Sequence, residues 1–113
     1  MAYTSFVDGL LILTRGDQVL LALRAGTGYC DGQWNVPSGK LEDGETVLDA
    51  AIREAREEIG TTFDVTELRH VATVHCRNPE GQRRVGLFFT VEYDPARHGE
   101  PFNAEPNKCA KIE

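Results

Sequence analysis

The sequence predicts an α/β fold in which at least one helix packs on a β-sheet. Residues 5–15 and 18–25 are apolar and rich in β-forming residues, and the turn Gly16-Asp17 between them predicts a hairpin. Residues 67–77 and 83–93 show the same pattern around the turn NPEGQ, which predicts a second hairpin. The stretch between the two hairpins has helical periodicity. The order hairpin, loop, helix, hairpin therefore indicates a sheet with a helix layer.

The predicted helix runs from Glu45 to Ile59, about fifteen residues or 22 Å. Gly60 follows it as a residue suited to a left-handed C-terminal cap. One apolar stripe supports the helix: Val47, Leu48, Ala51, Ile52 and Ala55. The glycine-rich stretch 26–39 before it is expected to be a long functional loop with one short strand at 34–36. A last strand is expected to begin near Lys108.

Length and composition narrow the class of protein. The 113 residues predict one domain covering 1–113. A net charge of −6 without a Lys/Arg run excludes a binder of duplex nucleic acid on electrostatic grounds. Three cysteines without a CxxC pair predict free thiols in a reducing cytoplasm rather than disulfides or a zinc site: Cys30, Cys76 and Cys109. The N-terminal apolar run is too short for a membrane span, and no signal peptide is expected.

Three carboxylates gather on one face of the predicted helix. Glu54, Glu57 and Glu58 stand at i, i+3 and i+4, about 5–6 Å apart at Cβ, where they repel each other. One interpretation is a solvated acidic face relieved by neighbouring arginines. The acids lie in the C-terminal half of the helix, however, where the helix dipole disfavours negative charge. Mg²⁺ and Mn²⁺ bind carboxylate oxygens, so a cation site is the alternative.

The spacing around these acids resembles a family motif. Gly39, five residues, Glu45, seven residues and then Arg53-Glu54-Ala55-Arg56-Glu57-Glu58-Ile59-Gly60-Thr61 resembles the Nudix box, which would span residues 39–61. All seven invariant positions match, and a chance match at one start point has a probability of about 10⁻⁸. Thr61 departs from the pattern because that position is usually aliphatic. The resemblance implies an α/β/α sandwich with a mixed β-sheet.

The resemblance also implies roles for residues of the box. Glu54, Glu57 and Glu58 would bind one to three Mg²⁺ or Mn²⁺ ions, with the carbonyl of Gly39 as a further ligand. Glu57 or Glu58 would also act through a metal-bound water that attacks a phosphoanhydride. Arg53 and Glu45 would form the ion pair that braces the junction of loop and helix and orients the catalytic acids.

Four residues outside the box are further candidates. Glu105, in the late loop EPNK, is either a further metal ligand or general base, or a surface acid. Arg24 either contacts phosphates or is a surface charge at a strand end. Tyr29 and Trp34 either line the substrate pocket or serve packing, as aromatic residues most often do.

The resemblance implies hydrolysis of a nucleoside diphosphate linked to another group, most simply a nucleoside triphosphate cleaved to a monophosphate and pyrophosphate. The alternatives are an ADP-ribose or nucleotide-sugar pyrophosphatase and a nucleotide-binding module without turnover. Relatives usually continue into a C-terminal helix that packs on the sheet, and this helix is expected to be missing from the chain. If so, an exposed sheet face favours association into a homodimer.

Overall fold

A computed structural model describes residue 2 and residues 4–113 of the chain. Its strands and helices follow one another in this order: β1 (Phe6–Arg15), β2 (Gln18–Val19), β3 (Ala22–Arg24), β4 (Trp34–Asn35), β5 (Ser38–Lys40), α1 (Val47–Ile59), the 3₁₀ helix η1 (Val65–Glu67), β6 (Arg69–Arg77), β7 (Arg83–Glu92), α2 (Pro95–His98) and β8 (Cys109–Ile112). The predicted α/β class is confirmed, and so are the short strand at 34 and the last strand near 108.

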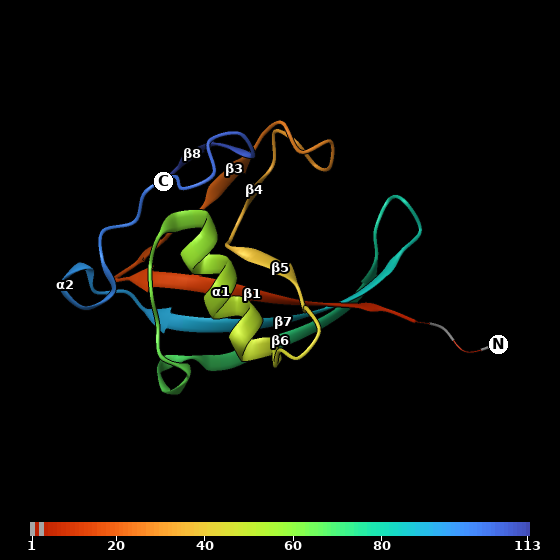
Figure 1. The fold of residues 1–113 in the computed structure, drawn as a ribbon, viewed down its shortest axis with the longest axis horizontal. Helices are drawn as coiled ribbons and strands as arrows, with labels where there is room; N and C mark the ends of the chain where they lie inside the picture. Colours follow the sequence, from red (N-terminus) through yellow and green to blue (C-terminus); the bar gives the residue numbers. More distant parts are fainter. Residues whose placement is uncertain (1, 3) are drawn as a thin grey trace.

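The strands form two sheets (Figure 1). The main sheet has the order β2-β1-β7-β6, with β5 also paired to β1. β1 runs parallel to β7 over nine residue pairs, from Phe6↔Arg84 to Thr14↔Glu92, and antiparallel to β2 and β5. The predicted mixed sheet is therefore confirmed. A smaller sheet, β4-β3-β8, lies above the main sheet in the view of Figure 1.

The two hairpins differ in how well the sequence predicted them. The second is confirmed, since β6 and β7 pair antiparallel up to Arg77↔Arg83 beside the turn. The first is only a short ribbon, because β2 ends at Val19 after two residue pairs. The expected strand 18–25 is split there: Leu21 exchanges backbone hydrogen bonds of 2.7 and 2.8 Å with Glu113, and β3 then joins β8 in the smaller sheet.

Helix α1 begins two residues later than predicted because Thr46 caps it. The Thr46 side chain accepts a hydrogen bond from the Asp49 N–H, and the Asp49 carboxylate accepts one from the Thr46 N–H. The helix ends as predicted at Gly60, whose φ of 72° lies in the left-handed region. The predicted stripe packs on the main sheet, with Ala51 and Ala55 fully buried.

The hydrophobic core lies between α1 and one face of the main sheet. Leu11 and Leu13 of β1 and Phe89 and Val91 of β7 are buried there against the helix. The helix lies so close to β1 that a Cβ on Gly9 would stand 2.9 Å from the carbonyl oxygen of Val47. This close packing fixes the helix and its acidic residues relative to β1 and its neighbour β5.

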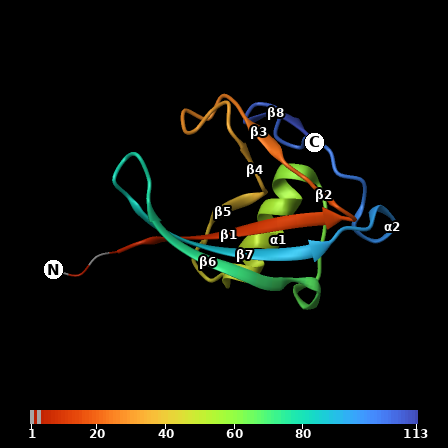
Figure 2. The same ribbon diagram turned by 180° about the vertical axis from the view of Figure 1, so that it is seen from behind.

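The opposite face of the main sheet has no helix in front of it in Figure 2. Within the part of the chain that the structure describes, α1 is the one long helix, and α2 is a single turn of four residues. The expected outer helix layer of an α/β/α sandwich is therefore not formed by the described residues, and association through this face remains a prediction. None of the described helices is long and apolar enough to span a membrane.

Candidate active site

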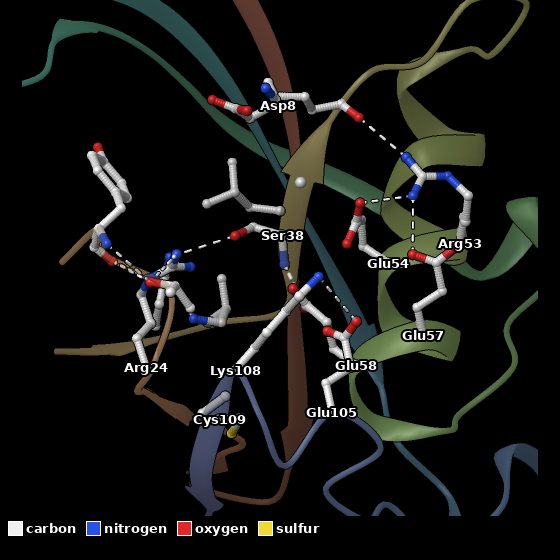
Figure 3. A pocket seen from close by; sticks show the side chains of 18 of the residues that line it. Asp8, Arg24, Ser38, Arg53, Glu54, Glu57, Glu58, Glu105, Lys108 and Cys109 are labelled. Carbon is white, nitrogen blue, oxygen red and sulfur yellow. Dashed lines mark hydrogen bonds and ion pairs between the residues drawn. The ribbon is translucent and has the colours of Figure 1, made fainter. Parts of the chain in front are cut away.

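A cavity of about 680 Å³ opens beside the C-terminal half of α1. Its wall combines side chains from β1, β5, β7 and α1 with the loop 25–33 and the segment 99–108 that precedes β8. The four glutamates that the resemblance offers as metal ligands all line it: Glu54, Glu57, Glu58 and Glu105 (Figure 3). The fold thus brings the box residues and the late-loop glutamate to one place.

Strand β5 brings Gly39 against the helix. It pairs with β1 through Asp8↔Lys40, Gly9↔Gly39 and Leu10↔Ser38. A Cβ on Gly39 would lie only 2.1 Å from Cδ and Oε1 of Glu54. A residue without a side chain is therefore required for Glu54 to lie where it does.

Arg53 organises the acidic residues around it. Its Nε donates to Glu45 Oε2 at 2.7 Å and its Nη2 to Glu45 Oε1 at 3.1 Å, so the expected ion pair is present and bidentate. Nη1 donates to Glu54 at 2.7 Å and to Glu57 at 3.2 Å. Nη2 also reaches the carbonyl oxygen of Lys40, which ties the helix to the end of β5. One guanidinium therefore fixes the junction of strand, loop and helix.

Glu58 is the acidic residue with the least charge compensation. Its Oε2 accepts a hydrogen bond of 3.0 Å from the Ser38 N–H. Burial, followed by the negative charge of Glu54, raises the pKa of Glu58 to about 8. Burial also raises the pKa of Glu54, although the neighbouring Arg53 opposes the shift. Without a cation the Glu58 carboxyl group is therefore mostly protonated at neutral pH, and a cation beside it would favour the charged form.

The segment 99–108 brings Glu105 beside these acids by capping the end of α1. The Phe102 N–H donates to the Ile59 carbonyl at 3.0 Å, and the Ala104 N–H donates to the Glu58 carbonyl at 3.1 Å. These bonds satisfy helix carbonyls that have no partner inside the helix. Lys108 approaches Glu105 at 3.8 Å in the same cavity (Figure 3).

The donor set fits a divalent cation in chemistry and charge. Carboxylate and carbonyl oxygens are the ligands that Mg²⁺ and Mn²⁺ prefer, and the raised pKa of Glu58 reflects an uncompensated buried acid. As they stand, no three acidic, His or Cys side chains among the described residues are grouped closely enough to hold an ion. Arg53 bonds one oxygen of Glu54 and one of Glu57, so the second oxygen of each carboxylate can face a cation while Arg53 holds the side chain in position.

Arg24 and Tyr29 line the cavity, but Arg24 is already bonded to its own loop. Its Nε donates to the Tyr29 carbonyl at 2.9 Å and its Nη2 to Thr27 Oγ1 at 3.2 Å, and its guanidinium lies 5.5 Å from the Tyr29 ring centre. The geometry favours a role in shaping the loop 25–33. Trp34 is 40% exposed under the Lys111 ammonium and is not among the described residues that line the cavity. Its substrate role stays a prediction.

Several polar residues of the cavity wall were not predicted from the sequence to be site residues: Asp8, Asn35, Lys40, Gln82, Arg84 and Lys108. Asp8 carried a usable signal, since it is a charged residue inside the apolar strand FVDGLLIL. Asp8 and Leu10, two residues apart on β1, lie on the same face of the strand, and both line the cavity rather than the core. The others come from distant segments, and nothing in their local sequence sets them apart.

Comparison with known proteins identifies the family. Residues 6–113 match the model of the NUDIX domain, so the chain belongs to the Nudix hydrolase family, and the resemblance drawn from residues 39–61 is confirmed. The 8-oxo-dGTP diphosphatase of Proteus vulgaris is 35% identical over 83 residues, covering 74% of this chain and 72% of that protein. The Nudix hydrolase YvcI of Bacillus subtilis is 40% identical over 94 residues, covering 83% and 56%.

Solved structures show the same fold. A MutT NUDIX hydrolase from Burkholderia pseudomallei superposes with a TM-score of 0.86 at 23% identity, covering 98% of this chain and 82% of that chain. The chain spans less than two thirds of several curated relatives, namely 18% of a Caenorhabditis elegans relative and 49% of the mouse oxidized purine nucleoside triphosphate hydrolase. The substrate and the activity of the whole protein are therefore proposals.

Proposed function

We propose that this chain catalyses cation-dependent hydrolysis of a nucleoside triphosphate to the monophosphate and pyrophosphate. The observation that carries the proposal is the meeting of four carboxyl groups in one cavity, those of Glu54, Glu57, Glu58 and Glu105. Glu54, Glu57, Glu58 and Glu105 would hold Mg²⁺ or Mn²⁺ together with the Gly39 carbonyl. The similarity to an 8-oxo-dGTP diphosphatase supports a nucleoside triphosphate as the substrate.

The chain's own residues have separate parts in this proposal. A bound divalent cation neutralises phosphate oxygens and lowers the pKa of a water molecule. Arg53 holds Glu54 and Glu57 in position from one side, and Ser38 holds Glu58 through its backbone N–H. Water adds to a phosphorus atom, the bond from that phosphorus to a bridging oxygen breaks, and the proton of the water passes to Glu57 or Glu58.

The decisive experiment is a substrate panel with purified protein and Mg²⁺. The panel contains the eight common nucleoside and deoxynucleoside triphosphates, 8-oxo-dGTP, ADP-ribose and a nucleotide sugar. Triphosphate turnover is detected as phosphate after a pyrophosphatase couple, and the other products are detected by chromatography. We expect release from a triphosphate. Turnover of ADP-ribose alone would show that the protein is an ADP-ribose pyrophosphatase instead. If no compound is hydrolysed, the protein would be a nucleotide-binding module without turnover.

Two variants connect turnover to the acids. Glu57→Gln keeps the shape of the side chain but removes a ligand charge, so we expect a loss of orders of magnitude in kcat with the fold intact. Glu92→Gln, at the exposed end of β7, is the matched control and should keep the rate. Mg²⁺ should raise the Tm of the wild type by mass action, and by less in Glu57→Gln. A fully active Glu57→Gln protein would place the metal site elsewhere.

A further inference from the structure

One ion pair in the cavity has no part in the chemistry above. Asp8 of β1 and Arg84 of β7 both line the cavity, and Asp8 lies apart from the acidic residues of α1 in Figure 3. Arg84 Nε donates to Asp8 Oδ2 at 2.7 Å, and Arg84 Nη2 donates to Asp8 Oδ1 at 2.6 Å. If the phosphates of a nucleotide lie beside the acidic residues of α1, the base and sugar extend along the rest of the cavity wall. The Asp8–Arg84 pair belongs to that part of the wall.

The pair holds Arg84 in one pose. The side chains of Arg84 and Asp8 are 21% and 13% exposed, so solvent competes little for their bonds. The Arg84 guanidinium carbon lies 5.0 Å from the centre of the Phe6 ring, and Phe6 is its register partner on the parallel strand β1. The two strands and the ring thus orient the guanidinium before any ligand arrives, which reduces the entropy lost on binding.

The bonds to Asp8 decide which donors remain. A guanidinium carries five N–H donors, and the two bonds to Asp8 use one on Nε and one on Nη2. Two donors on Nη1 and one on Nη2 are left, and two of these form a second fork at the end of the side chain. Asp8 neutralises the charge of Arg84, so this fork suits a neutral acceptor better than a phosphate.

We infer that Arg84, oriented by Asp8, is a specificity-determining residue that binds the keto oxygen of a purine base. Guanine presents its keto oxygen O6 and its ring nitrogen N7 as two neighbouring acceptors, and an arginine fork donates one hydrogen bond to each. Adenine presents an amino group at the same position, and its N–H donors face the N–H donors of Arg84. The inference rests on the proposed function, because it requires that the substrate be a nucleotide with its base at this wall.

The expected preference is measurable. A well-formed bidentate contact of this kind discriminates between bases by about 5- to 150-fold. We therefore expect the wild type to hydrolyse dGTP with a kcat/KM at least about fivefold above that for dATP.

Arg84→Lys tests the assignment, because lysine keeps a positive charge beside Asp8 but lacks the fork. It should reduce the ratio of dGTP to dATP turnover towards one, mainly through the KM for dGTP, and leave dATP turnover within about twofold of the wild type. Arg83→Lys is the matched control: the adjacent residue on the same strand is not among the described residues that line the cavity. Its ratio should equal that of the wild type.

Three results would overturn the inference: a wild type without preference for dGTP, an Arg84→Lys protein that slows both substrates equally, or an unchanged ratio in that variant. If the Arg84→Lys protein does not fold, a binding measurement on the wild type still tests the inference. Calorimetric titration with dGMP and dAMP should show the same preference, and equal affinities would also overturn the inference. If no nucleotide is hydrolysed, the proposed function fails, while the titration still shows whether Arg84 distinguishes the bases.

Discussion

Replacing Gly39 with alanine should inactivate the site more than it unfolds the protein. A Cβ at this position would lie 2.1 Å from Glu54 Cδ and Oε1 and 2.7 Å from Cγ. Carbon atoms in contact are normally about 3.5–4.0 Å apart, so the Glu54 side chain has to turn away. Its 2.7 Å bond to Arg53 Nη1 is then lost.

The size of the stability change follows from that lost bond. A hydrogen bond between charged groups contributes about 1.5–3 kcal/mol. Glu54 can regain bonds to water because its side chain is 16% exposed, so the low end of about 1.5 kcal/mol applies, or about 6 °C in Tm for a domain of this size. Disturbing the residues that orient a metal ligand typically costs about 10- to 100-fold in activity or metal affinity, and we expect kcat/KM to fall by at least that factor.

Gly44→Ala is the matched control for Gly39→Ala. A Cβ at Gly44 meets no atom within 4 Å, but its φ of 82° strains any other residue, at a cost of about 1–2 kcal/mol. Both variants should melt at similar temperatures in circular dichroism, while Gly39→Ala alone loses turnover of the best substrate. A Gly39→Ala protein with the wild-type rate, or equal losses in both variants, would refute the reasoning.

Three further predictions concern the brace, the acid stability and the core. Arg53→Lys loses a fork that bonds three glutamates, so steady-state kinetics should show kcat reduced by about 10- to 100-fold; an unchanged kcat would show that the acids are oriented by other contacts. A hydrogen bond from the backbone N–H of Asp64 and, to a smaller extent, one from the His98 side chain lower the pKa of Glu67 from its ordinary 4.5. The ionised Glu67 carboxylate therefore stabilises the fold above pH 4.5, and this stabilisation is lost as the pH falls below that value. Urea unfolding from pH 6 to pH 3 should therefore show a weaker dependence on pH in Glu67→Gln, and an identical dependence would contradict the prediction. Thr61 is fully buried and its hydroxyl has no hydrogen-bond partner among the described residues, so Thr61→Val should raise the stability by about 1 kcal/mol, or about 4 °C in Tm; a lower Tm would reveal a partner for the hydroxyl.

The local features of the fold could be predicted from the sequence. The helix, its end at Gly60 and the β6–β7 hairpin depend on residues close together in the chain, whose spacing and turn residues indicate the structure directly. The departure at Thr61 was visible as well, and the structure shows its consequence as a buried hydroxyl without a partner in the described chain. The spacing of the box likewise predicted the ion pair between Arg53 and Glu45.

Features that depend on distant segments were missed or wrong. The strand expected at 18–25 is split because Leu21 pairs with Glu113 at the other end of the chain, which no local pattern reports. For Arg24 the sequence left a phosphate contact and a surface charge open, and the structure adds that its donors bind Thr27 and the Tyr29 carbonyl of the adjacent loop. That loop has left-handed residues whose conformation decides where the carbonyls point, and the sequence does not show this.

The proposed chemistry of the site depends mainly on residues close together in the chain, whereas its proposed choice of substrate depends on residues far apart. Three of the four acids that would hold the cation come from one helix, and a glycine fifteen residues before Glu54 makes room for that side chain, so a motif of 23 residues predicts these three. The pair that we assign to the base joins residues 76 positions apart, and it forms because β1 and β7 run side by side in parallel. Substitutions at such a pair leave the motif intact. Members of one family can therefore keep the phosphate chemistry while the strand positions facing the cavity change the base that is accepted.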